Sequence, residues 1–75
     1  MGAVEDVEIS GDMIRLGQLL KFANVAESGS DAAALVAGGD VLVNGEVEQR
    51  RGRQLHRGDL VEILTPAERL GLRVR

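Results

Sequence analysis

The segment at residues 44–57, NGEVEQRRGRQLHR, gathers the residues that are best suited to bind phosphate. It contains four arginines, at Arg50, Arg51, Arg53 and Arg57. A guanidinium group donates parallel hydrogen bonds to phosphate or carboxylate oxygens, and its flat face stacks on nucleobases. Four positive and two negative charges leave this segment at +2, whereas the whole chain carries −3. Positive charge is therefore concentrated in one part of an acidic chain.

Charge alone leaves three interpretations of these arginines open. They could belong to a solvated hairpin loop and pair with Glu46, Glu48 or the acidic N-terminus. The second interpretation, nucleic-acid binding, is about as well supported by charge as the solvated loop. The third is a docking patch for an acidic protein. Arginine in place of lysine favours recognition of phosphate or carboxylate groups.

Residues that commonly perform catalysis are scarce in this chain. His56 is the only histidine and cysteine is absent, which excludes a Cys–His nucleophile and a multi-histidine metal site within one chain. The glycines of residues 36–45, VAGGDVLVNG, match neither a P-loop nor a dinucleotide-binding fingerprint. We therefore predict no enzymatic activity, no catalytic residue, no metal site and no cofactor.

Length and composition indicate one small cytoplasmic domain. A chain of 75 residues is sufficient for a single core, and Phe22 is the only aromatic residue, so the core must be aliphatic. The absence of cysteine fits a reducing compartment. No run of 18 or more apolar residues occurs, and we predict no association with the membrane.

The N-terminal half predicts an acidic arm followed by a helix. Residues 4–10, VEDVEIS, alternate apolar and acidic residues imperfectly, which indicates a short strand or an extended arm. Asp12 is a candidate N-cap for a helix from Met13 to Phe22. Its apolar residues recur at helical spacing and share one face, at Met13, Leu16, Leu20 and Ala23.

A second helix is predicted to begin at Ser28 and to end at Gly38 and Gly39. Ser28 and Asp31 have the spacing of a capping box, and alanine-rich residues follow. Glycine tolerates the left-handed conformation that closes helices.

The C-terminal half predicts antiparallel strands. Residues 40–48, DVLVNGEVE, indicate a hairpin, because Asn44-Gly45 readily adopts positive φ at both turn positions. Residues 60–64 alternate as a further strand that Pro66 terminates. Residues 67–75 are compatible with a helical turn, a strand or disorder, and we assign them no function.

This order of elements predicts an α+β fold with two short helices packed on a small, mainly antiparallel sheet. We predict an acidic arm at residues 1–11, a domain at residues 12–65 and a C-terminal tail at residues 66–75.

Residues 14–63 resemble the RNA-binding domain family named after ribosomal protein S-four, and especially its compact stand-alone bacterial branch. The resemblance rests on the order and spacing of motifs: Arg15-Leu16, Ser28, Gly39, Val41-x-Val43-Asn44-Gly45-x-Val47, Arg50-Arg51-Gly52-Arg53 and Gly58-Asp59. In this family the two helices and the hairpin, known as the αL motif, grip structured RNA. The resemblance therefore implies binding to ribosomal or transfer RNA, with a ribosomal particle as a candidate partner. Arg50, Arg51 and Arg53 are the expected contacts, and Lys21, Arg15 and Arg57 are secondary ones.

Two departures from the family pattern affect this expectation. The family usually has Asp after the opening Arg-Leu, where this chain has Gly17. Relatives also carry Arg or Lys in the middle of the second helix, where this chain has alanine at residues 32–34. Half of the expected basic surface is therefore missing. The alternative function is a protein-interaction module that keeps the fold and has weak or no affinity for RNA.

Overall fold

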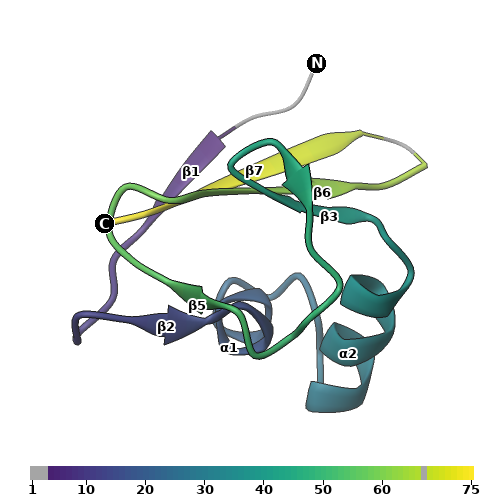
Figure 1. Ribbon diagram of the computed structural model, residues 1–75, viewed down its shortest axis with the longest axis horizontal. Helices are drawn as coiled ribbons and strands as arrows, with labels where there is room; N and C mark the ends of the chain where they lie inside the picture. Colours follow the sequence, from purple (N-terminus) through teal and green to yellow (C-terminus); the bar gives the residue numbers. More distant parts are fainter. Residues whose placement is uncertain (1–3, 67) are drawn as a thin grey trace.

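Helices and sheet form separate layers (Figure 1). The computed structural model describes residues 4–66 and 68–75, so residues 1–3 of the predicted arm and residue 67 of the predicted tail lie outside the described residues. Within these ranges the elements follow one another as β1 (Val4–Val7), β2 (Ile14–Arg15), α1 (Leu16–Phe22), α2 (Gly29–Ala37), β3 (Val41–Val43), β4 (Glu46–Val47), β5 (Gln54–Leu55), β6 (Leu60–Leu64) and β7 (Arg69–Val74).

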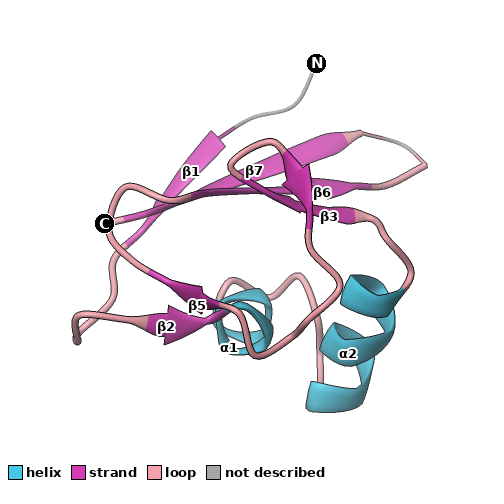
Figure 2. Cartoon of the chain, in the orientation of Figure 1, coloured by secondary structure: helices cyan, strands magenta, loops and turns pink. Residues whose placement is uncertain are grey.

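The strands that the structure describes form one large and one small sheet. The large sheet has the order β1-β7-β6-β3-β4, in which β1 runs parallel to β7 and the other pairs are antiparallel. The small sheet pairs β2 with β5 in antiparallel orientation. Figure 2 shows both helices and the β2–β5 ribbon on the same side of the large sheet. The predicted α+β fold is confirmed.

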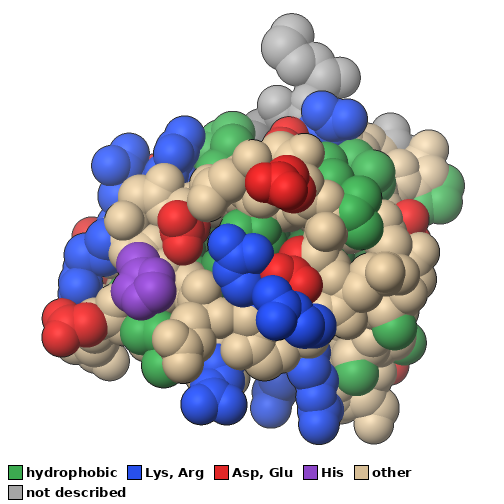
Figure 3. Space-filling model, viewed as in Figure 1, with side chains coloured by type: hydrophobic (Ala, Val, Ile, Leu, Met, Phe, Trp, Pro, Cys, Tyr) green, Lys and Arg blue, Asp and Glu red, His purple; other side chains and the backbone are tan. Residues whose placement is uncertain are grey.

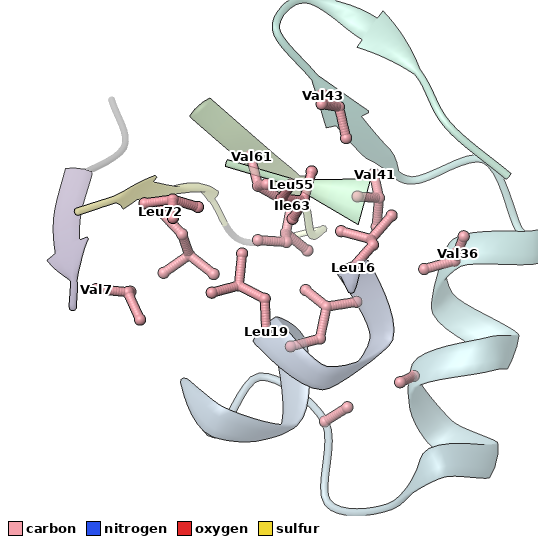
Figure 4. Packing of buried hydrophobic residues seen from close by; sticks show 14 residues of the cluster. Val7, Leu16, Leu19, Val36, Val41, Val43, Leu55, Val61, Ile63 and Leu72 are labelled. Carbon is pink, nitrogen blue, oxygen red and sulfur yellow. The ribbon is translucent and has the colours of Figure 1, made fainter. Parts of the chain in front are cut away.

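The core fills the space between the two layers. Figure 4 shows Leu16 and Leu19 of α1 facing Val61 and Ile63 of the sheet, and Val36 of α2 pointing into the same cluster from the side. All buried apolar residues are aliphatic, as the composition predicted. Phe22 lies outside this core and is 65% exposed. No described helix is long and apolar enough to cross a membrane.

The first helix begins later than the sequence predicted. The expected start at Met13 with Asp12 as the cap is wrong, because Ile14 and Arg15 pair with β5 as strand β2. The helix begins at Leu16, and Arg15 stands at the N-cap position with an extended backbone. The Arg15 N–H donates to Gln18 Oε1 at 3.3 Å.

The second helix and the first hairpin follow the sequence prediction. Ser28 caps α2, because its Oγ accepts a hydrogen bond from the Asp31 N–H at 3.1 Å. Gly39 has φ +83° just after the helix end. At the hairpin turn, Asn44 has φ 51° and Gly45 has φ 87°, as a two-residue turn of the expected type requires.

Asn44 also joins the hairpin to the turn that precedes β6. Its amide Nδ2 donates to Asp59 Oδ1 at 3.1 Å, and its Oδ1 accepts from the Leu60 N–H at 3.0 Å. Partial burial acts to raise the pKa of Asp59, but hydrogen bonds from the His56 N–H and the Asn44 amide outweigh it and hold the pKa below its usual value. The motif residues Asn44 and Asp59 therefore act together in the fold.

Replacing Asn44 with alanine is expected to lower the free energy of unfolding by about 2–4 kcal/mol, because positive φ is strained for alanine and two hydrogen bonds are lost. Asn44→Gly is the matched control, since glycine removes the same hydrogen bonds and accepts the positive φ. Urea unfolding should show a smaller loss for the glycine variant. Equal losses would show that backbone conformation at residue 44 contributes nothing.

Both ends of the described chain lie in the large sheet. Of the three alternatives for the C-terminal residues, the strand is present as β7, which pairs with β6 and β1. The Arg75 N–H donates to Val7 O at 2.9 Å, and the Ile9 N–H donates to Arg75 O at 3.1 Å. The segments predicted as arm and tail therefore support each other within the sheet.

Candidate nucleic-acid interface

The basic loop, which we define as residues 48–53 between β4 and β5, lies against the N-terminus of α1. The Leu16 N–H donates to Arg53 O and the Gly17 N–H donates to Arg51 O, both at 2.9 Å. A Cβ atom on residue 17 would lie 3.4 Å from Arg51 Cβ, so glycine permits this close approach. These two backbone N–H groups belong to the first turn of α1 and have no acceptor within the helix, so they hold the basic loop in place.

Glu48 anchors two of the arginines in this loop. Its carboxylate is buried, with Oε2 at 3.1 Å from Arg50 Nε and Oε1 at 2.8 Å from Arg53 Nη1. The Arg50 N–H also donates to Oε2 at 3.2 Å. Hydrogen bonds from the side chains of Arg50 and Arg53 lower the pKa of Glu48 from 4.5 to about 2. Glu48 therefore remains charged at neutral pH and holds both guanidinium groups.

The side chains of Arg50 and Arg53 remain partly exposed to solvent. The Arg50 side chain is 77% exposed and the Arg53 side chain is 38% exposed. Both line an open hollow together with Gly52, Gln54, His56 and Asp59. A guanidinium group has five N–H donors, so contacts to Glu48 leave several available. The pairing with Glu48 that the sequence left open is present, and it fixes the orientation of both arginines.

Arg57 lies apart from the basic loop. Its Nη2 donates to Ile9 O at 3.1 Å, and its Nη1 is 3.7 Å from Asp12 Oδ1. Arg57 therefore ties the segment after β5 to the segment after β1.

Arg15, Lys21 and Arg51 surround a groove beside α1. The groove has a volume of about 290 Å³, and its other lining residues are Gly17, Gln18, Gly29, Ala32 and Gly52. All three cationic side chains are exposed, and none of them forms an ion pair with residues 4–66 or 68–75. Figure 3 shows Lys and Arg side chains gathered along the lower edge, where α1 and the basic loop lie in Figure 1. We call this feature the basic groove.

The second helix supplies the floor of the basic groove. Ala32 is 1% exposed and belongs to the core, so this position has no room for a long basic side chain. Gly29 and Ala32 are one turn apart and both line the groove. The alanines predict a helix and a loss of positive charge, but this role was not predicted from them, although small residues at helical spacing were the signal. Small side chains allow another backbone to approach closely.

A sequence model of the S4 domain family matches residues 7–70, which is most of the chain. The chain belongs to the S4 domain family. The match extends from the end of β1 into β7. The resemblance drawn from the sequence motifs is confirmed.

A curated relative supports the same assignment for this S4 domain. The probable ribosome maturation protein RlbA of Bacillus subtilis (strain 168) is 49% identical over 57 residues. The alignment covers 76% of this chain and 80% of the relative. At this identity and coverage, the two chains share the greater part of one domain.

Proposed function

We propose that this S4 domain binds structured RNA, without catalysis, through the basic groove. The observation that carries the proposal is the convergence of Arg15, Lys21 and Arg51 on one groove, with no ion-pair partner among the described residues. Cationic side chains without an ion-pair partner attract phosphates, and their binding releases counterions from the RNA. The floor of glycine and alanine lets an RNA backbone lie close to the peptide backbone.

Arg50 and Arg53 extend the same surface through the donors that Glu48 leaves available. The basic groove adjoins the hollow that Arg50 and Arg53 line, because Gly52 lines both. A phosphate chain that follows the basic loop passes all three arginines. Arg57 contributes less, because it is engaged by Ile9 and Asp12.

The RNA that suits this surface is folded rather than extended. A-form helices hide their base edges in a deep major groove, so proteins recognise them mainly by shape, phosphates and 2′-hydroxyl groups. A small rigid groove with few cations fits that mode of recognition. The name of the RlbA relative refers to ribosome maturation. We therefore propose ribosomal RNA as the first candidate, with transfer RNA as the second, bound in the cytoplasm on or near a ribosomal particle.

A fluorescence-anisotropy titration with a labelled RNA hairpin tests this function. Three phosphate contacts predict a log–log salt slope between about −2 and −3, so affinity should fall roughly 20- to 40-fold between about 50 and 200 mM salt. Unstructured single-stranded RNA of equal length should bind more weakly. Absence of salt-dependent binding to the hairpin would reject the proposal and favour a protein-interaction module.

A further inference from the structure

The only aromatic side chain of this protein lies on the surface beside the basic groove. Phe22, in the last turn of α1, is 65% exposed, whereas the core is entirely aliphatic. It lines a second hollow of about 470 Å³ with the apolar side chains of Ile9, Met13 and Ile14. Phe22 and these neighbours form one exposed apolar patch, and such a patch is typical of a contact site.

The second hollow adjoins the basic groove through Gln18. Gln18 lines both features, with Lys21 and Arg15 on one side and Phe22 on the other. Residues 15, 18 and 22 follow helical spacing along one face of α1. The seven steps from residue 15 to residue 22 rise about 10 Å along the helix axis, which is within the span of one or two nucleotides. A phosphate bound at Arg15 would thus place a neighbouring base within reach of Phe22.

Charge at the rim determines which part of a nucleotide can enter the second hollow. Glu8 lines it, and the described residues include no ion-pair partner for its carboxylate. A negatively charged rim disfavours a phosphate but not an uncharged base. Gln18 Oε1 accepts from the Arg15 N–H, so its NH₂ group remains the donor at the border between the two features.

We propose that Phe22 is a stacking platform for one unpaired nucleobase of an RNA whose adjoining phosphates lie in the basic groove. This inference rests on the proposed function and narrows it to a substrate class. The substrate is a helical RNA that carries a bulged or flanking unpaired nucleotide, and a fully paired helix lacks the base that Phe22 contacts. Aromatic side chains commonly hold splayed-out bases of folded RNA in this way.

The test compares two RNA hairpins that differ by a single bulged nucleotide. For Phe22→Ala, affinity for the bulged hairpin is expected to fall roughly 5- to 100-fold, the usual range for loss of one base–aromatic stack. Affinity for the fully paired hairpin should stay within about two-fold of the wild type, because the basic groove is unchanged. Phe22→Leu keeps an apolar side chain and should behave like the alanine variant, whereas Phe22→Trp should retain the preference.

A fluorescent base supplies a second measurement. With 2-aminopurine at the bulge, binding of the wild type and of Phe22→Trp should change its emission as the base leaves the RNA stack for the aromatic ring, and binding of Phe22→Ala should leave the emission unchanged. The exposure of Phe22 predicts an unchanged urea midpoint, which serves as the folding control. Equal affinity of all variants for the bulged hairpin would overturn the inference. If the wild type binds neither hairpin, the proposed function itself fails.

Discussion

Replacing Arg15, Lys21 and Arg51 together with glutamine is expected to lower affinity for a structured RNA hairpin roughly 100-fold at about 0.1 M salt. Each of these cations contributes to one phosphate contact, and no residue that the structure describes neutralises them by an ion pair. The salt slope should become shallower than in the wild type, because Arg50 and Arg53 are the main cations that remain on the proposed RNA-binding surface. Anisotropy titrations at several salt concentrations provide both quantities.

A charge-matched variant serves as the control for this experiment. Replacing Arg69, Arg73 and Arg75 with glutamine removes the same amount of positive charge from β7 and the residue after it. These arginines contact Glu62, the Gly58 carbonyl and Asp6, and β7 lies in the opposite layer from α1 (Figure 1). Affinity should change less than about three-fold. Equal losses in the two triple variants would mean that net charge, and not the basic groove, governs binding.

Replacing Glu48 with glutamine is expected to lower the free energy of unfolding at neutral pH by about 1–3 kcal/mol. The buried carboxylate accepts hydrogen bonds from both Arg50 and Arg53, and an amide cannot accept all of them. Glu46→Gln is the control, since Glu46 is exposed in β4 and the described residues include no ion-pair partner for it. Urea unfolding of the three proteins measures the difference.

The pH dependence of that difference identifies the charged carboxylate as its cause. The pKa of Glu48 is lowered from 4.5 to about 2, so its stabilising contribution is complete above about pH 4.5 and is lost as the pH falls toward 2. The gap in unfolding free energy between the wild type and Glu48→Gln should therefore narrow over this window. A gap that stays constant from neutral pH to pH 3 would contradict the role of the charged pair.

Local signals in the sequence predicted the second helix and the hairpin correctly. Both signals are local in the sequence. The helix cap is a hydrogen bond between Ser28 and Asp31, and the hairpin turn depends on the backbone angles of Asn44 and Gly45. The start of α1 depends on distant residues instead. Carbonyls of Arg51 and Arg53 satisfy the donors of Leu16 and Gly17, and pairing with β5 draws Ile14 and Arg15 into a strand. Periodicity in residues 13–22 carries no information about that partner.

The candidate interface was only partly predictable for the same reason. Sequence proximity placed Arg50, Arg51, Arg53 and Arg57 in one group, but the structure gives them different surroundings. Arg51 joins Arg15 and Lys21 at the basic groove, whereas Arg57 turns toward Asp12. The burial of Glu48 depends on how the chain turns after β4, so a list of charges cannot show which carboxylate becomes the anchor.

Amide chemical-shift mapping with a labelled protein and an RNA hairpin tests most directly whether RNA occupies the basic groove. The amides of Gly17, Gly29 and Gly52, which line the groove, should shift strongly when RNA is added. The chemical shifts of the amides in β7, residues 69–74, should not change. If the largest shifts occur on β7 and the groove amides do not shift, RNA does not bind in the basic groove.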